Sequence, residues 1–147
     1  TIMDIMDEME ELQEKDRVIE IRAYDTVYGV WKYFTVWEEQ MNLERESYCL
    51  IGTLEAWNAM CQYFGREKMI PVYIEVEDGT RLIRAVERER TQEHPGYEEL
   101  CRRFLADAKD FSEENLKNAG ITRRFENKDM NACLEEIKLF IQKAILI

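Results

Sequence analysis

An apolar stripe at helical spacing, set between two short apolar runs, constrains the fold of this chain more than any other feature. Residues 48–53 and 70–76 show little alternation of apolar and polar positions, as in strands that are covered on both faces. Between these runs, apolar residues recur about every 3.6 positions, and the stripe ends at Gly65. Its members are Leu54, Trp57, Met60, Cys61 and Phe64. A strand, a helix and a strand in this order predict a parallel sheet and therefore an α/β fold.

More strands and helices are expected on either side of this unit. Two β-branched and aromatic runs, 17–24 and 27–34, are separated by the turn-like pair Asp25-Thr26 and predict a β-hairpin. Ser112 is a typical N-cap residue, so we expect a short helix that ends near Gly120, with a last strand at 121–125. Apolar residues at helical spacing predict further helices over 1–14, over 79–90 with Leu82, Ile83 and Val86 facing inward, over 97–111 and over 130–144.

The composition predicts one acidic globular domain. The chain has 147 residues, of which 46% are apolar, enough for a real core. Acidic residues outnumber basic ones by 31 to 20, which gives a net charge of −11. Such a charge repels nucleic acids and anionic membrane surfaces, so we expect no DNA, no RNA and no membrane as partners. A few arginines can still form a positive pocket for a mononucleotide within an acidic surface.

The cysteines and the single histidine, His94, argue against a zinc site. The four cysteines form no C-x-x-C pair, and we expect no metal held by the chain itself. Three of them, Cys61, Cys101 and Cys133, fall on apolar stripes and are expected to be buried, reduced thiols. The sequence has no run of about 20 apolar residues and no basic-then-apolar leader, so a cytoplasmic location is expected.

Several short motifs follow one another along nearly the whole chain. They are Val18-Ile-Glu20, Val27-Tyr28-Gly29, the run from Tyr48, the arginines at 84, 88, 102 and 103, and Phe125-Glu-Asn127-Lys-Asp129. In order and spacing these motifs resemble the guanylate kinases, which transfer a phosphate from ATP to GMP. The resemblance implies an α/β fold with a parallel sheet of the P-loop kinase type, helices on both of its faces and a small GMP-binding hairpin lobe. It places the lobe at 1–46 and the kinase core at 47–147, with a mobile lid at about 89–103.

Three residues match the positions at which the family binds GMP. The resemblance implies that Glu20 holds the guanine edge and Tyr28 the phosphate, and Thr53 stands at a strand end near the guanine. A carboxylate accepts hydrogen bonds from the N1 and amino groups of guanine, and a phenol donates to a phosphate oxygen. On their residue types alone, Glu20 and Tyr28 are equally a solvated strand glutamate and an ordinary hairpin tyrosine. Thr53 also fits the N-cap of the helix that follows it.

The predicted phosphate-binding residues are arginines. The resemblance implies that Arg84, Arg88 and Arg103 are catalytic, and that Arg84 and Asn127 bind ATP, with Mg²⁺ as the second cofactor. Phosphoryl transfer needs cations around the moving group, which guanidinium groups supply. From spacing alone, the arginines also fit a charged helix face paired with neighbouring glutamates, and Asn127 fits a helix cap.

The chain departs from the family in several places. The family has a small hydroxyl residue at the position of Val30 and two aspartates at the positions of Ile51 and Thr53. A G-x-x-x-x-G-K-[ST] loop for ATP phosphates does not occur. In the family the strand before that loop lies in the middle of the sheet, and a sheet without it has unpaired edges. We therefore expect an upstream segment before Thr1, or a strand swapped from a second copy in a homo-oligomer.

Three functions remain open from the sequence. The first is a guanylate kinase whose full-length form converts GMP to GDP with ATP and Mg²⁺, the printed chain being inactive by itself. The second is a non-catalytic, guanylate-kinase-like module that binds a partner protein, which the substitutions at Val30, Ile51 and Thr53 favour. The third is an α/β domain without retained activity. Composition and periodicity support all three equally, and the resemblance favours the first.

Overall fold

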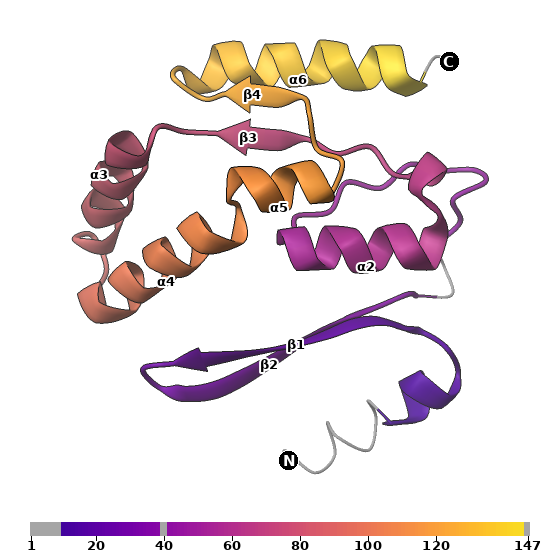
Figure 1. Cartoon of the computed structure of the whole chain (residues 1–147), viewed down its shortest axis with the longest axis horizontal. Helices are drawn as coiled ribbons and strands as arrows, with labels where there is room; N and C mark the ends of the chain where they lie inside the picture. The colour runs from indigo at the N-terminus through magenta and orange to yellow at the C-terminus, as the bar shows by residue number, and fades with distance from the viewer. Residues whose placement is uncertain (1–9, 39–40, 146–147) are drawn as a thin grey trace. The chain divides into compact units, whose positions relative to one another are not determined.

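The computed structural model describes residues 10–38 and 41–145 and has a mixed α/β fold with two small sheets (Figure 1). It consists of two compact units, Thr1–Met69 and Ile70–Ile147. Most of the helix predicted over 1–14 lies outside the described residues, and its last five residues, 10–14, are helical. The predicted division into a lobe at 1–46 and a core at 47–147 concerns the kinase resemblance and stays a prediction.

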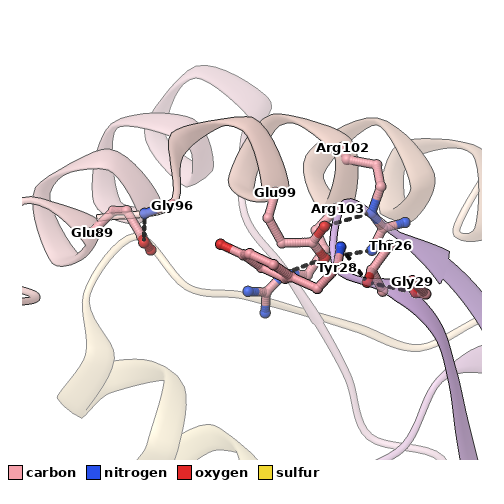
Figure 2. A network of polar contacts seen from close by, with 8 residues as sticks. All are labelled: Thr26, Tyr28, Gly29, Glu89, Gly96, Glu99, Arg102 and Arg103. Atoms are coloured by element: carbon pink, nitrogen blue, oxygen red, sulfur yellow. Dashed lines mark hydrogen bonds and ion pairs between the residues drawn. The ribbon is translucent and has the colours of Figure 1, made fainter. Parts of the chain in front are cut away.

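The first unit begins with the predicted β-hairpin. Strands β1 (Val18–Thr26) and β2 (Gly29–Val36) pair antiparallel, which confirms the hairpin. The turn comprises Val27 and Tyr28, two residues later than predicted. The Thr26 hydroxyl stabilises it, because this group donates to the Gly29 carbonyl at 2.8 Å and accepts from the Tyr28 N–H at 3.1 Å (Figure 2). Gly29 has a φ of 108°, which disfavours any residue with a side chain there.

The predicted helix after the hairpin is confirmed as α2 (Leu54–Phe64). Thr53 is its N-cap, since the Thr53 hydroxyl accepts from the Ala56 N–H, and Gly65 ends it at a φ of 93°. A 3-10 turn, η1 (Arg66–Lys68), follows. The buried face of α2 consists of Leu54, Ala56, Trp57 and Met60. The 3.6-residue stripe in the sequence therefore identified the buried side of this helix correctly.

The strand predicted over 48–53 is absent from the structure. This segment has no regular secondary structure, and Ile51 is fully exposed, at 104%. A strand is stable only with a hydrogen-bonding partner, and in the described part of this unit the strands β1 and β2 pair with each other. The prediction of a strand–helix–strand crossover between 48 and 76 is therefore wrong.

The second unit contains the only parallel pairing in the described part of the chain. Strand β3 pairs with β4 in the register Tyr73↔Arg124, Ile74↔Phe125 and Glu75↔Glu126. Three helices connect the two strands and a long helix ends the chain (Figure 1). The elements are β3 (Tyr73–Glu75), α3 (Asp78–Glu89), α4 (Tyr97–Asp110), α5 (Glu113–Asn118), β4 (Arg124–Glu126) and α6 (Met130–Ile145). A parallel sheet is thus present with two strands, of which β3 lies within the predicted strand 70–76 and β4 overlaps the predicted strand 121–125.

The core of the second unit is apolar and centres on β4. Phe125 is 0% exposed, and its ring contacts that of Phe140 on α6, with centroids 5.2 Å apart. Leu116 on α5 is also fully buried. The predicted burial of the cysteines is correct for Cys133 and wrong for Cys101, which is exposed at the α4 surface; Cys61 of the first unit is half-buried.

Helices α3 and α4 form a pair in the region predicted to be a lid. The Arg81 guanidinium lies 4.1 Å from the centroid of the Phe104 ring and 3.9 Å from an Asp107 oxygen. The Glu89 carboxylate accepts from the Gly96 N–H at 2.6 Å and so closes the loop between the helices (Figure 2). Within α3, all of which is described, no residue is buried, and the inward orientation expected of its apolar residues is wrong for Leu82 and Ile83, which are both exposed.

Candidate functional site

One face of the hairpin carries a buried charged cluster around Glu20. Because side chains alternate along a strand, Glu20 and Arg22 lie on the same face of β1, and Thr35 is opposite Glu20 on β2. The Thr35 hydroxyl donates to Glu20 Oε1 at 2.9 Å, and Arg22 Nε lies 3.0 Å from Glu20 Oε2. The side chains of Glu20 and Arg22 are 4% and 14% exposed. The carboxylate is therefore held from both sides and is mostly withdrawn from water.

The contact between Glu20 and Arg22 is an ion pair rather than an aligned hydrogen bond. Glu20 Oε2 and Arg22 Nε are close enough to bond, yet neither has a hydrogen-bond partner among the described residues. The N–H group therefore does not point at the oxygen. Attraction between two charges depends weakly on angle, so the pair stabilises the buried carboxylate even without good alignment.

Arg22 also connects this cluster to Thr53. Its Nη1 group donates to Thr53 Oγ1 at 2.7 Å and to the Tyr24 hydroxyl at 3.1 Å. Arg22 and Thr53 are 31 residues apart in the sequence. The arginine thus brings together Glu20 and Thr53, two of the three residues predicted to bind GMP.

Tyr28 lies apart from the buried cluster, in the hairpin turn. It is 68% exposed. A strand rises about 3.3 Å per residue, which puts the turn about 20 Å along β1 from Glu20. Only an elongated ligand with different chemistry at its two ends could contact both side chains.

In the second unit, Arg84 and Asn127 lie together at the ends of the parallel strands. Arg84, on α3, donates to the backbone carbonyls of Asn127 at 3.1 Å and Lys128 at 3.3 Å, although Arg84 and Asn127 are 43 residues apart in the sequence. The Asn127 N–H donates to the Glu75 carbonyl and extends the pairing of β3 with β4. The two residues predicted to bind ATP are therefore neighbours.

The side chain of Asn127 has an unused acceptor. Its Oδ1 atom is buried and has no hydrogen-bond partner among the described residues. Helix α6 is capped by Asp129, whose Oδ1 accepts from the Ala132 N–H at 2.8 Å, so capping does not account for Asn127. A buried polar atom without a partner is costly and calls for a water or a ligand group that donates to it.

A cavity of about 300 Å³ opens beside Asn127 at the carboxyl ends of β3 and β4. In open α/β sheets ligands bind at this end of the strands. Glu77 caps α3 here, and its pKa is held below the usual range by hydrogen bonds from the N–H groups of Gly79 and Thr80. The α3 N-terminus is thus already occupied by a carboxylate. The cavity is lined by Val76, Glu77, Thr80, Arg84, Glu126, Asn127 and Lys128.

The other two predicted catalytic arginines do not line this cavity. Arg103 is an exposed residue of α4 whose Nε lies 3.4 Å from a Glu99 oxygen. The buried Glu99 carboxylate also accepts two hydrogen bonds from Arg102, at 2.9 and 2.7 Å (Figure 2). Arg88 is exposed on α3, and its side chain makes no hydrogen bond or ion pair with any described residue. The catalytic roles of Arg88 and Arg103 stay predictions.

The cavity is lined by two cations, Arg84 and Lys128, and by the amide side chain of Asn127. The free acceptor of Asn127 suits an amino group, and Arg84 supplies a positive charge. Mg²⁺ requires carboxylate oxygens, but Glu77 caps α3 and Glu126 is paired with Lys128 at 2.8 Å. Among the described residues, no group of three or more metal-ligating side chains occurs.

Sequence reasoning missed two residues of the hairpin cluster, Arg22 and Thr35. The alternation of β1 contained a signal for Arg22, because it stands two positions after Glu20 and so shares its face. Thr35 could be identified only from the strand register, which depends on the turn at Val27 and Tyr28. The sequence placed that turn two residues too early, so it did not give the register that puts Thr35 opposite Glu20.

Comparisons with protein-family models, with curated proteins and with solved structures find no match to this chain. Across the residues that the structure describes, every helix is too short or too polar to pass through a bilayer. The resemblance to guanylate kinases therefore stays a prediction from the motifs of the sequence. The cytoplasmic location stays a prediction.

Proposed function

We propose that this chain is the nucleotide-binding part of a guanylate-kinase-like enzyme that phosphorylates GMP to GDP with ATP. The observation that carries the proposal is the pairing of residues that the resemblance assigns to one ligand. Glu20 and Thr53, assigned to GMP, share Arg22. Arg84 and Asn127, assigned to ATP, adjoin one cavity. Both pairs are far apart in the sequence, so helix or strand periodicity does not account for them.

In the proposal, GMP binds to the hairpin of the first unit. The Glu20 carboxylate accepts from Thr35 and lies next to Arg22, and its side chain is 4% exposed, so the guanine edge reaches it only when this face of the hairpin opens. Tyr28 is exposed in the turn and supplies a phenol to the phosphate at the far end of the nucleotide. The separation of about 20 Å between Glu20 and the turn is longer than one GMP molecule, so both side chains contact the same nucleotide only if they lean toward each other.

ATP is assigned to the cavity of the second unit. Asn127 lines this cavity, and a rotation that exposes its buried Oδ1 would let this atom accept from the exocyclic amino group of adenine. Arg84 binds the negatively charged phosphates of ATP. The exposed cations Arg88 and Arg103 neutralise the charge on the phosphoryl group during its transfer. Bound ATP would supply the transferred phosphoryl group. The residues of this chain would bind the nucleotide, orient it and neutralise the charge on its phosphates.

The finer fold assignment belongs to the same proposal. A parallel sheet of the P-loop kinase type would continue beyond β3 and β4, and Ile74 in the middle of β3 is 50% exposed, whereas parallel strands are usually covered on both faces. A strand from an upstream segment, or from a second copy in a strand-swapped homo-oligomer, would complete such a sheet. Light scattering of the purified chain tests the second possibility: a dimer supports strand exchange, and a monomer contradicts it.

The kinase proposal is tested by an assay of ADP release, coupled to a spectroscopic readout, on the full-length gene product. GMP, AMP, UMP and CMP are supplied in turn with ATP and Mg²⁺. We expect turnover with GMP well above that with the other three. Arg88→Ala is expected to reduce kcat, because one cation around the transferred phosphate is removed. If none of the four acceptors gives turnover, the proposal that the protein is a nucleoside monophosphate kinase is refuted.

A second candidate function is a non-catalytic module that binds a partner protein. One observation favours it: the tip of the hairpin exposes apolar and aromatic side chains, with Val30 62% and Trp31 50% exposed. Exposed apolar groups of this kind are common where another protein binds. Calorimetry distinguishes the two functions, since the module binds a peptide and gives no heat with GMP, whereas the kinase binds GMP.

A further inference from the structure

A second cavity, of about 250 Å³, lies beside helix α6 in the second unit. It is lined by Arg123, just before β4, and by four residues of α6, which packs along β4 (Figure 1). The α6 residues are Glu136, Leu139, Phe140 and Lys143. Their spacing of three and four positions puts these side chains on one face of the helix. None of the five lining residues is assigned to either nucleotide.

The wall of this cavity is apolar, and contacts with aromatic rings hold it in place. The Phe140 ring packs on the buried Phe125 ring, with centroids 5.2 Å apart. The Arg123 guanidinium lies over both rings, 5.0 Å from the centroid of Phe125 and 5.8 Å from that of Phe140. Leu139 is 57% exposed, so much of its side chain faces water. Covering such surface with an alkyl chain is favourable because of the hydrophobic effect.

The charged groups around the cavity sum to one positive charge. Arg123 Nη2 donates to Glu136 Oε1 at 2.8 Å, and this ion pair neutralises the carboxylate. The Lys143 ammonium makes no hydrogen bond or ion pair with any described residue. A lysine stem lies along apolar surface while its ammonium stays in water. The cavity therefore combines an apolar wall with a cation that no described residue compensates, on a chain whose net charge is −11.

We propose that this cavity binds small amphipathic carboxylates, of which a straight-chain fatty acid is the simplest. The alkyl chain packs on Leu139 and Phe140, and the carboxylate pairs with Lys143. A purely polar anion leaves the apolar wall unused, and a neutral apolar molecule leaves the ammonium without a partner, so an amphipathic anion matches both. Arg123 has further N–H groups for the same carboxylate, because a guanidinium has five donors and Glu136 accepts from one of them.

The first test measures how affinity depends on chain length, by calorimetric titration of the purified chain with butyrate, hexanoate and octanoate. Each CH₂ group that becomes buried contributes about 0.8 kcal/mol, which is about fourfold in affinity. Octanoate should therefore bind about 15-fold more tightly than hexanoate and about 200-fold more tightly than butyrate. Octan-1-ol has the same chain without the charge and serves as the neutral probe in the variants.

Substitutions at the two ends of the ligand separate the charge from the apolar wall. Lys143→Gln should weaken octanoate about threefold, as for an exposed ion pair, and leave octan-1-ol unchanged. Leu139→Ala should weaken both probes about fivefold, because part of the apolar wall is removed. The matched control is Lys138→Gln, at a lysine of α6 that pairs with Glu135 at 2.8 Å and does not line the cavity. It should change neither affinity, and circular dichroism confirms that each variant is folded.

Every outcome of these titrations supports or overturns the fatty-acid site. Weaker octanoate binding in Lys143→Gln and Leu139→Ala, with Lys138→Gln unchanged, supports it. Equal affinities for butyrate and octanoate overturn it, because no alkyl chain is then buried. An octanoate affinity that survives either cavity substitution, or that falls equally in Lys138→Gln and Lys143→Gln, also overturns it. If the unmodified chain does not bind octanoate, the site is refuted and the two proposed nucleotide sites are unaffected, since they use other residues.

Discussion

The two units place their candidate ligand residues in opposite environments. In the first unit, Glu20 and Arg22 form a buried ion pair that Thr35 and Thr53 complete by hydrogen bonds. In the second unit, Arg84 is exposed and donates to backbone carbonyls at the rim of a cavity. The residues of the hairpin cluster are therefore held in place by their own contacts before any ligand binds. The position of Arg84, in contrast, depends on the contact between α3 and the loop after β4.

The difference has energetic consequences for each unit. A buried charged pair is costly to disturb, because removing one partner leaves the other charge without compensation. An exposed arginine is cheap to remove, because water replaces its partners. Substitutions in the first set should therefore reduce both stability and ligand binding, and substitutions such as Arg84→Ala should reduce ligand binding alone.

The largest expected effect lies in the apolar core of the second unit. Phe125→Ala should lower the free energy of unfolding by about 3–5 kcal/mol, because this side chain is fully buried and contacts Phe140. Urea unfolding followed by circular dichroism measures it. Leu139→Ala on the exposed side of α6 is the control, with a change within about 0.5 kcal/mol. Equal effects of the two substitutions would show that the core is not centred on β4.

The next effect breaks the buried pair of the first unit. Arg22→Ala should cost about 3 kcal/mol, because the Glu20 carboxylate is left buried without a counter-charge. Glu20→Ala combined with Arg22→Ala should cost less than the sum of the two single changes, by about 1–3 kcal/mol. A double-mutant cycle in urea measures this coupling. Additive single effects would show that the two side chains do not interact in solution.

A smaller effect is expected at the start of α2. Thr53→Ala should lower the free energy of unfolding by about 1 kcal/mol, because α2 loses its N-cap and Arg22 loses an acceptor. Thr53→Ser keeps the hydroxyl and should be close to the unmodified protein. Thermal unfolding monitored at a helix wavelength compares the two. A serine variant as weak as the alanine variant would mean that the methyl group of Thr53, and not its hydroxyl, stabilises α2.

The smallest effect is a pH dependence at the cavity rim. Hydrogen bonds from the Gly79 and Thr80 N–H groups lower the pKa of Glu77 from its ordinary 4.5, so the carboxylate stabilises α3 above pH 4.5 and this contribution is lost as the pH falls through the lowered value. Glu77→Gln should be less stable than the unmodified protein at neutral pH, and the difference should vanish in acid. Melting temperatures across this range measure it; a difference that grows in acid would contradict the cap.

Periodicity and capping signals in the sequence were sufficient for the helices. Thr53 and Gly65 bound α2, and Ser112 starts α5 by accepting from the Asn115 N–H, all as expected from residue type. The two β-branched and aromatic runs also predicted the hairpin. Its turn was misplaced because Asp25-Thr26 has typical turn composition, while the structure uses Gly29 at positive φ to close the turn.

The sequence could not supply the contacts that depend on pairing between distant segments. The apolar run at 48–53 has the composition of a strand. Composition does not show, however, whether a neighbouring strand is available to pair with this run. Strand alternation puts Glu20 and Arg22 on one face of β1, but the link of Arg22 to Thr53 requires α2 to pack on β1. The sequence alone also fits Asn127 as a helix cap. The structure shows that Asp129 caps α6 and that Asn127 Oδ1 has no hydrogen-bond partner among the described residues.

The most direct test of two separate nucleotide sites is a calorimetric comparison of Arg22→Gln with Arg84→Ala, each titrated with GMP and with a non-hydrolysable ATP analogue. The account predicts that Arg22→Gln weakens GMP and leaves the ATP analogue unchanged, and that Arg84→Ala does the reverse, by about tenfold in each case. The same loss for both ligands in both variants, or no binding of either ligand to the unmodified protein, would contradict it.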